Sequence, residues 1–410
     1  MLTKSSTELV RQQNSSLVLS ALRRGGPLAH TDLSVLTGLS SATVSAITAD
    51  LERVGILERL EQKPPTGRGR PRVLFSQRRD SGYIIVVRIS SDTVQYSLAD
   101  YSGTLMDRFE EARGTSSGAG SAAASDPKAF CAAVVAALDR LAQRSRLERR
   151  QVVAVSISSK GLVDRDAARL IWSPIFGTAE IDFAALLAGA GWDATVVLSN
   201  ETLLVAQALM AAAGRGAETP PALAALSLGH SIGLGIARQG RGGETEASAP
   251  NFGHMLHTPD AGLCRCGARG CVEAAAGFYG ILRKAFQVPS DTIPAKFVPL
   301  AEMDKIAVSA RQQNRMAGYA FREAGAALGH GLARLISLYG AMPIHVTGLG
   351  LRYFDLMHQS MEEALALSHA VRIGGMPAIH VVQDEPGLVF SGHLELALQV
   401  VDASILSARL

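Results

Sequence analysis

Long apolar runs are missing from this 410-residue chain, and no segment reads as a membrane-spanning helix. The segment from Met1 to Ser16 is polar and lacks the apolar core of a secretory signal. Cysteine is also scarce: the chain has four, and three of them lie within eight positions. Thiols used in this way fit a reducing cytoplasm. We therefore expect a cytoplasmic protein with no membrane partner.

The chain contains enough hydrophobic residues to form large buried cores. Hydrophobic residues make up 47% of the chain and charged residues 19%, a balance typical of globular proteins. A chain of this length exceeds one ordinary core, so we expect two or three domains.

Positive charge is concentrated at the start of the chain. Residues 1–80 hold twelve Lys and Arg against seven Asp and Glu, a net +5, which leaves a net −2 for the rest. A basic head on a near-neutral body indicates a polyanion partner for the head alone. Plain solvation of five surplus charges is the alternative.

The clustered cysteines have the spacing of a metal site. Cys264, Cys266 and Cys271 follow His254, and together they supply three thiolates and one imidazole. This is a complete tetrahedral set for Zn²⁺, with no open position for water, so the ion would be structural rather than catalytic. Three free thiols in a loop are the alternative. The fourth cysteine, Cys131, lies in a helical pattern and is expected to be a small buried hydrophobe.

Residues 1–80 carry the pattern of a winged helix-turn-helix. Apolar spacing predicts helices over 15–24, over 32–37 with Thr31 as the cap, and over 41–54. The short break Gly38-Leu39-Ser40 separates the last two, with Leu39 filling the core between the helices and Ser40 capping the third. Residues 55–57 and 73–75 predict two short strands around a polar loop, which would form the wing.

Two groups of side chains in this head are candidates for contact with DNA. One is the hydroxyl-rich start of the third helix, and the other is the basic run in the wing; the residues are Ser40, Ser41, Thr43, Ser45, Arg68 and Arg70. Short hydroxyls can approach phosphates and base edges in a major groove, and arginines can enter a narrow minor groove. For the three helices the alternative is an interaction module with no DNA role. For the basic run in the wing the alternative is a basic linker.

The rest of the chain alternates strand and helix patterns. Strand patterns cover 83–98, 152–157, 195–198, 222–228 and 344–346, and helix patterns cover 128–143, 203–213 and 320–338. This indicates an α/β body with mixed sheets, long enough for two lobes. Two glycine runs, 229–235 and 348–350, could cradle phosphate, but glycines at tight turns explain them equally well.

Taken together, these residues resemble the ROK family, which contains bacterial sugar kinases and sugar-responsive transcriptional repressors. The resemblance covers essentially the whole chain, and its most specific part is Gly253-His254 followed by the three cysteines and Glu273. The head up to Pro71 resembles the repressor branch. The resemblance implies a winged helix-turn-helix at 1–80 and a two-lobed body of the actin-like, ribonuclease-H-like fold, with lobes at 81–200 and 201–410. The C-terminal helix would return to the first lobe.

The family resemblance also implies a sugar in the cleft between the lobes. His254 would bind zinc through one ring nitrogen and face the sugar through the other. The implied effector-binding residues are Asn200, Glu201, Asn251, His254 and Glu273. For two of them the residues alone leave a simpler role open: Glu201 as a helix cap and Glu273 on a solvated helix face.

Departures from the kinase pattern argue against phosphoryl transfer. Where ROK kinases have an Asp-x-Gly-Gly-Thr turn, this chain has Arg88 at the acidic position and Ser90 and Ser91 in place of the glycines. Glu201 stands where the family has a catalytic aspartate, and Asn251 where it has a sugar-binding glutamate. These changes remove a metal-holding carboxylate and place side chains where a triphosphate must approach closely.

We therefore expect a sugar-responsive DNA-binding repressor rather than an enzyme. It would carry structural Zn²⁺, bind a sugar or sugar phosphate, and read a pseudo-palindromic operator as a homodimer or tetramer. The alternatives are an active sugar kinase with a DNA-binding head and a ligand-independent regulator controlled by a protein partner.

Overall fold

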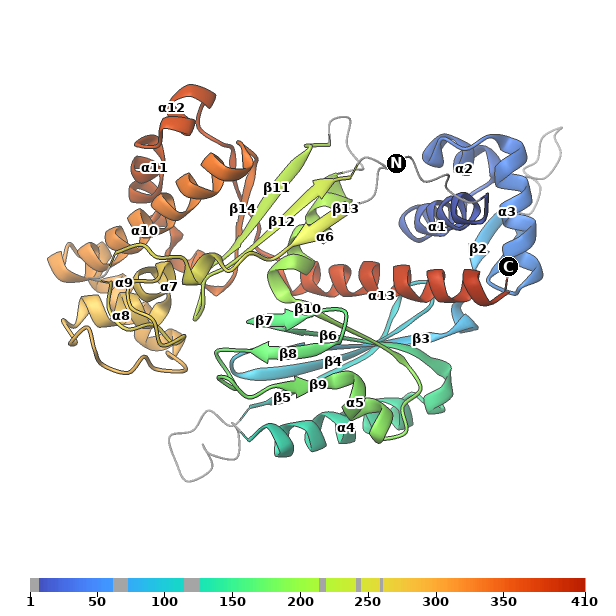
Figure 1. Cartoon of the computed structure of the whole chain (residues 1–410), viewed down its shortest axis with the longest axis horizontal. Helices are drawn as coiled ribbons and strands as arrows, with labels where there is room; N and C mark the ends of the chain where they lie inside the picture. The colour runs from blue at the N-terminus through green and yellow to red at the C-terminus, as the bar shows by residue number, and fades with distance from the viewer. Residues whose placement is uncertain are drawn as a thin grey trace.

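The computed structural model describes residues 7–61, 73–113, 126–213, 219–240, 245–258 and 261–409. These form a small N-terminal head and a body of two α/β lobes, and the last helix runs from the lobe junction to the head (Figure 1).

The head consists of three helices and a two-stranded hairpin. Its elements are α1 (Thr7–Gly25), α2 (His30–Thr37), α3 (Ser41–Arg53), β1 (Leu57–Glu61) and β2 (Val73–Gln77). Gly38 adopts φ 70° and ends α2, and Ser40 caps α3 by accepting a hydrogen bond from Thr43 N. Leu39 packs against the core between the helices. The predicted helix-turn-helix is therefore confirmed.

Two local predictions in the head are wrong. Helix α1 begins at Thr7, earlier than its apolar pattern suggested. Thr31 does not cap α2, which begins at His30 with Ala29 at the cap position. Instead, the Asp32 carboxylate accepts the hydrogen bond of Ala29 N at 3.0 Å, because an acidic residue in the first turn can reach back to a free amide.

The two wing strands pair antiparallel, with Leu57 opposite Gln77 and Glu61 opposite Val73. Leu28 bridges to Phe75 and joins the wing to the helices. The predicted wing arginines, Arg68 and Arg70, lie in the segment 62–72, outside the described residues.

The first lobe is built on a five-stranded sheet of order β10-β6-β3-β4-β5. Its elements are η1 (Arg79–Ser81), β3 (Tyr83–Ile89), β4 (Thr93–Asp100), β5 (Leu105–Ala112), α4 (Pro127–Arg144), η3 (Arg149–Gln151), β6 (Val152–Ser159), α5 (Phe183–Gly189) and β10 (Thr195–Asn200), with a small sheet of β7 (Leu162–Asp164), β8 (Arg169–Trp172) and β9 (Ile181–Asp182). The alternating run 83–98 forms the hairpin β3–β4, and the polar residues 90–92 make its turn.

The second lobe repeats the topology of the first. Its sheet has the order β13-β12-β11-β14-β15, so each sheet has three antiparallel strands followed by two parallel strands added beside the first of them. The elements are α6 (Glu201–Ala213), which enters the lobe, β11 (Ala222–Ser227), β12 (Gly233–Gln239), β13 (Thr245–Ser248), η4 (Phe252–His254), α7 (Val272–Ala276), α8 (Phe278–Ala285), α9 (Leu300–Arg311), α10 (Arg315–Tyr339), β14 (Ile344–Thr347), η6 (Leu349–Leu356), α11 (His358–Ala366), α12 (His369–Gly374) and β15 (Ile379–Val381). Two repeats of this order make an actin-like body.

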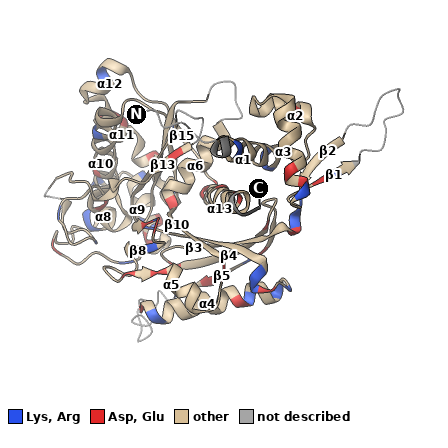
Figure 2. Ribbon diagram, turned by 45° about the vertical axis from the view of Figure 1, so that its right-hand side comes forward, with Lys and Arg blue, Asp and Glu red and all other residues tan. Residues whose placement is uncertain are grey.

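The last helix, α13 (Glu385–Arg409), leaves the second lobe and lies between α1 of the head and the first-lobe sheet (Figure 2). By length and composition its segment Glu385–Leu406 could cross a membrane, contrary to the expectation from the sequence. Its apolar character is explained by contacts on several sides: α13 packs on α6, β6, β3 and α1. A helix surrounded by protein in this way reads as apolar around its circumference.

Candidate functional site

A cavity of about 110 Å³ lies between the two lobes. The first lobe contributes Lys160, Gly161, Leu162, Trp172, Pro174 and Asn200, and α6 and the second lobe contribute Thr202, Ser227, Ser231, Ile232, Gly233, Leu234, Ala249, Pro250, Asn251, His254 and Glu273. Four of the five residues predicted to bind the effector therefore line one cavity. The fifth, Glu201, does not.

Asn200 lies at the point where the chain passes from the first lobe to the second. Its side-chain oxygen accepts hydrogen bonds from Thr202 N at 2.9 Å and Thr202 Oγ1 at 2.7 Å, and its amide donates to Gly161 O at 2.8 Å. The side chain thus caps the start of α6 and holds the turn that carries Lys160. Asn200 is fixed before any ligand arrives, as a binding residue should be.

Glu273 comes from the first turn of α7 and is only 2% exposed, so its placement on a solvated helix face is excluded. Its carboxylate accepts hydrogen bonds from Ile232 N at 3.3 Å and from the Tyr279 hydroxyl at 3.4 Å. Burial raises the pKa of Glu273, although the charges of His254 and Arg265 act against this. A carboxyl group that is buried and faces a cavity can exchange hydrogen bonds with a polyol.

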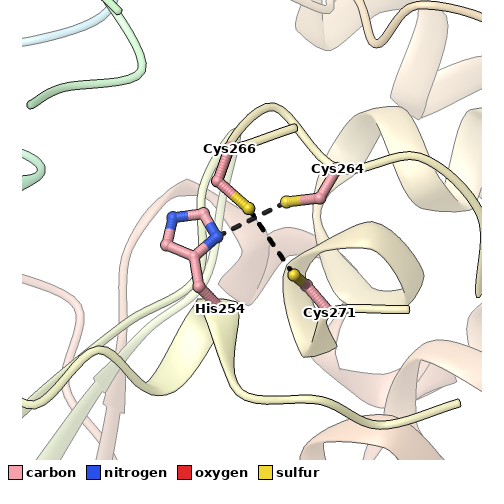
Figure 3. Close-up of side chains that lie close together, drawn as sticks. All are labelled: His254, Cys264, Cys266 and Cys271. Atoms are coloured by element: carbon pink, nitrogen blue, oxygen red, sulfur yellow. Dashed lines mark hydrogen bonds between the residues drawn. The ribbon is translucent and has the colours of Figure 1, made fainter. Parts of the chain in front are cut away.

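The four predicted metal ligands are brought together (Figure 3). Their donor atoms all lie within 4.8 Å of one another; His254 Nδ1 is 3.4 Å from Cys264 Sγ, and Cys266 Sγ is 3.7 Å from Cys271 Sγ. Gly267 and Gly270 both have positive φ, which lets the loop return Cys271 to the cluster. The cluster could hold a metal ion.

Two of the donor separations match the edges of one tetrahedral site. Zinc bonds of ~2.3 Å to sulfur and ~2.0 Å to nitrogen give edges of about 3.8 Å between sulfurs and about 3.5 Å between sulfur and nitrogen. Both measured separations lie within about 0.2 Å of these edges. Burial raises the pKa of Cys264 to about 11, so this thiol needs a bound cation to ionise at neutral pH. A metal bound at Nδ1 leaves the other nitrogen of His254 free for a ligand in the cavity.

Arg88, on β3, pairs with two carboxylates at the junction of the lobes. Its Nε donates to Glu201 Oε1 at 2.9 Å, and its Nη2 donates to Glu385 Oε2 at 3.3 Å. Ser90 Oγ also donates to Glu201 Oε1, at 3.4 Å. Burial alone would raise the pKa of Glu201, but the charges of Arg88 and Lys160 outweigh it and hold that pKa below its usual value. Glu201 is therefore an ionised partner of Arg88.

The two glycine runs are explained by close packing. A Cβ on Gly235 would lie 2.0 Å from Thr202 O, because β12 passes directly against α6. Gly348 has φ +95°, and a Cβ there would lie 2.4 Å from Leu228 O. Both positions need glycine to fit the backbone together, so neither run requires a phosphate ligand.

Lys160 is a site residue that the sequence gave no reason to single out. Among the described residues that line the cavity it is the one lysine or arginine. Its Nζ lies 3.9 Å from Glu201 Oε2, beyond hydrogen-bonding distance, and its side chain is 21% exposed. Only its position after β6, beside the turn at Gly161, places it in the cleft.

The candidate DNA face of the head lies at the start of α3. Ser40, Ser41 and Ser45 are exposed, and Thr43 is half-buried with its hydroxyl 2.8 Å from Ser40 Oγ. Four hydroxyls are thus gathered at a helix N-terminus, where backbone N–H groups and the helix dipole favour a phosphate.

Comparison with known proteins agrees with this architecture. The ROK family profile matches residues 122–383. The DNA-binding transcriptional repressor Mlc of Escherichia coli strain K12 is 22% identical over 401 residues, covering 96% of this chain and 94% of Mlc. A xylose repressor of Caldicellulosiruptor bescii is 21% identical over 366 residues, covering 87% of this chain and 88% of the repressor.

Two solved structures show the same fold. A ROK family transcriptional regulator, a homologue of E. coli Mlc, superposes with a TM-score of 0.73 at 18% identity, covering 97% of this chain and 98% of that one. A ROK family glucokinase from Streptomyces griseus, solved with glucose and AMPPNP, superposes with a TM-score of 0.53 at 23% identity, covering 77% of this chain and 99% of that one. With its matching profile and its actin-like body, the chain belongs to the ROK family.

Proposed function

We propose that this protein is a sugar-responsive transcriptional repressor. Residues 1–80 would bind operator DNA, and the lobes 81–200 and 201–410 would hold a sugar between them. One observation carries the proposal: a single chain joins a helix-turn-helix head to a sugar-kinase-type cleft in which Arg88 pairs with Glu201. Full-length relatives named as repressors, one of them for xylose, support it.

The effector would lie in the interlobe cavity. Asn200, Asn251, His254 and Glu273 would present donors and acceptors to its hydroxyls, and the ammonium group of Lys160 would add a further donor. Glu201 would act from behind, as the counter-charge that holds Arg88 and Lys160 in place. Trp172 of the first lobe meets the edge of His254 at 5.1 Å between ring centroids, so ligand binding would be sensed by both lobes.

The metal in the cluster would be Zn²⁺, held by His254, Cys264, Cys266 and Cys271. Four protein ligands leave no open position, so the ion would orient His254 and its loop without taking part in chemistry. The donor separations that fit a tetrahedral ion support this assignment.

DNA contact would come from Ser40, Ser41, Thr43 and Ser45 on α3, with Arg68 and Arg70 from the wing. Two heads are needed to read a palindromic operator, so the working form would be a homodimer or a dimer of dimers in the cytoplasm. Sedimentation analysis of the free and operator-bound protein tests the assembly.

We further propose that the cleft does not transfer phosphate. General-base action on a sugar hydroxyl needs a carboxylate that is free to accept a proton, and Glu201 is held by the guanidinium of Arg88. Metal-bound ATP also needs an acidic ligand at the first turn, where this chain has Arg88. An ATP-dependent turnover assay over a panel of hexoses tests this point. Saturable phosphorylation of any hexose would establish the kinase alternative.

The direct test of the effector site is a thermal-shift screen of pentoses, hexoses and their phosphates on the zinc-loaded protein. A ligand that binds the native state raises the unfolding temperature by mass action. Stabilisation by one sugar class in the wild type, and its loss in Asn200→Ala, would support the site. No stabilisation by any sugar, with DNA binding intact, would favour control by a protein partner.

A further inference from the structure

The DNA-binding head is docked rigidly on the body. Apolar residues of α1, of α13 and of the first-lobe sheet form one continuous core, which includes Val18, Leu22, Ile84, Leu398 and Val401. Within the head, Gln77 at the end of the wing donates to Leu19 O of α1 at 3.2 Å, so the wing is tied to the helix that packs on α13. A head that shares its core with the body cannot move as a free module. Its orientation follows that of the helix on which it rests.

A buried ion pair fixes the head to the far end of α13. The guanidinium of Arg23 on α1 contacts both carboxylate oxygens of Asp402, each at 2.6 Å. The Tyr101 hydroxyl, at the end of the first-lobe hairpin β4–β5, donates to the same carboxylate at 2.5 Å. Asp402 is 1% exposed. Three elements, one each from the head, the first lobe and α13, therefore meet at one carboxylate.

A buried ion pair at this contact indicates that the orientation of the head on α13 matters more than the stability of the contact. Apolar residues of the same size would stabilise the contact equally well, because burying two charges costs desolvation. A two-point guanidinium–carboxylate contact, unlike an apolar one, fixes both distance and angle. The Arg23–Asp402 pair is thus suited to hold the head in one defined pose on α13.

The opposite end of α13 lies at the junction of the lobes. Glu385, in its first turn, accepts a hydrogen bond from Ser227 of the second lobe at 2.6 Å and pairs with Arg88 of the first lobe at 3.3 Å. A change in the angle between the lobes must alter at least one of these contacts. Ser227 also lines the effector cavity, so a ligand there lies directly beside this end of the helix.

Between its ends α13 is held against the first-lobe sheet by polar contacts. His393 is completely buried, with Nδ1 2.8 Å from Ser156 Oγ and Nε2 2.9 Å from Ser158 Oγ, both on β6. Glu385 and Asp402 are seventeen positions apart, which at 1.5 Å per residue separates them by about 26 Å along the helix. A straight helix of that length carries a shift or rotation at one end to the other without needing a flexible linker.

We propose that α13 couples the effector cavity to the DNA-binding head. A change in the angle between the lobes would move Glu385 through its contacts with Arg88 and Ser227. The helix would transmit this movement to the head through the Arg23–Asp402 pair. This inference rests on the proposed sugar-responsive function and assigns Arg23 and Asp402 as positioning residues. Neither residue lies at the effector cavity or among the candidate DNA contacts. Their loss should therefore separate sugar binding from the response of DNA binding.

The test uses the full-length zinc-loaded protein and an operator selected from genomic DNA fragments. Operator affinity is measured by fluorescence anisotropy at fixed salt, with and without the sugar that stabilises the wild type most. Asp402→Asn removes the charge and keeps the shape, and Arg23→Gln removes the other partner. Asp402→Glu restores the carboxylate, and Gln399→Ala changes an exposed residue on the same helix. Sugar binding to each variant is measured separately by calorimetry.

We expect the wild type and Gln399→Ala to show a sugar-dependent change in operator affinity of at least about fivefold. Asp402→Asn and Arg23→Gln should bind the sugar as the wild type does, with an operator response below about twofold, and Asp402→Glu should recover part of it. A full response in both Asp402→Asn and Arg23→Gln would overturn the role of α13. If no sugar binds the wild type, the proposed function itself fails, a result distinct from a variant that keeps its response.

Discussion

Arg88 Nε lies 2.9 Å from Oε1 of Glu201, across 113 positions of sequence. A guanidinium on β3 thus neutralises a buried carboxylate in the first turn of α6. The same guanidinium reaches Glu385, so both segments that cross between the lobes, α6 and α13, are tied to β3. One arginine thus joins the two segments that cross between the lobes.

We predict that Arg88→Met destabilises the protein by about 3–5 kcal/mol, because it leaves two buried carboxylates without their counter-charge. The midpoint of urea unfolding measures the loss. The double variant Arg88→Met/Glu201→Gln, in which one of the stranded charges is removed, should recover part of it. Equal stability of Arg88→Met and the wild type would show that solvent, rather than Arg88, stabilises the negative charge of Glu201.

Metal content tests the cluster. We predict one zinc ion per chain by elemental analysis and its loss in Cys266→Ala, together with loss of the thermal stabilisation by sugar, because His254 is no longer oriented. Cys131→Ala is the matched control and should keep both zinc and sugar binding. The head should remain folded in the Cys266→Ala protein, because it lies far from the cluster in the chain and packs on α13. A Cys266→Ala protein that still responds to its sugar would show that the cluster stabilises only its own loop and has no role in the response.

A substitution at Ser40 separates folding from DNA binding. Aspartate is as good a helix cap as serine, so Ser40→Asp should keep α3 folded while placing a negative charge on the candidate DNA face. We predict a loss of operator affinity of about tenfold or more with an unchanged unfolding midpoint. Ser40→Ala should show the reverse, a loss of about 1 kcal/mol in stability with a smaller effect on DNA. Unchanged affinity in Ser40→Asp would remove the start of α3 from the interface.

The buried His393 gives the protein an acid-sensitive stability. Burial lowers its pKa to about 3, with Glu201 acting against this and Arg88 reinforcing it, whereas an unfolded chain has it near ~6.5. As the pH falls the unfolded state takes up the proton first, so the stability is complete above about pH 6.5 and declines below it.

Between pH 7 and pH 5 this residue should account for a loss of about 2 kcal/mol. His393→Asn should therefore show a flatter fall of the urea midpoint over that range, even where its stability at pH 7 is lower. His230 also has its pKa lowered to about 3 by burial and stays in the variant, so some pH dependence remains. An unchanged slope in His393→Asn would show that His393 does not contribute.

Local signals made part of the structure predictable from the sequence. Gly38 and Ser40 act on their neighbours in the chain, so the turn and the cap of the helix-turn-helix could be predicted. The metal cluster could be predicted because its spacing follows from the reach of a short loop around Cys264–Cys271. The wrong cap at Thr31 shows the limit, because α2 begins earlier than its apolar pattern, at His30, and Asp32 instead accepts from Ala29 N.

The parts that sequence reasoning missed depend on distant segments. The Arg88–Glu385 contact joins residues 297 positions apart, and the Arg23–Asp402 contact joins residues 379 apart. Lys160 enters the cleft only because β6 ends beside β10, with Ser159 opposite Asn200, in the folded sheet. Substitution at Arg88 could be recognised as a departure from a kinase turn, but its ion-pair partner Glu385 could not.

The most direct test of the account is the affinity of the zinc-loaded protein for its selected operator, measured by anisotropy with and without each sugar of the panel and without ATP. We predict that at least one sugar or sugar phosphate changes the dissociation constant about fivefold or more, and that Asn200→Ala abolishes the change. Operator affinity that is identical with every sugar, in a protein that phosphorylates a hexose when ATP is added, would contradict it.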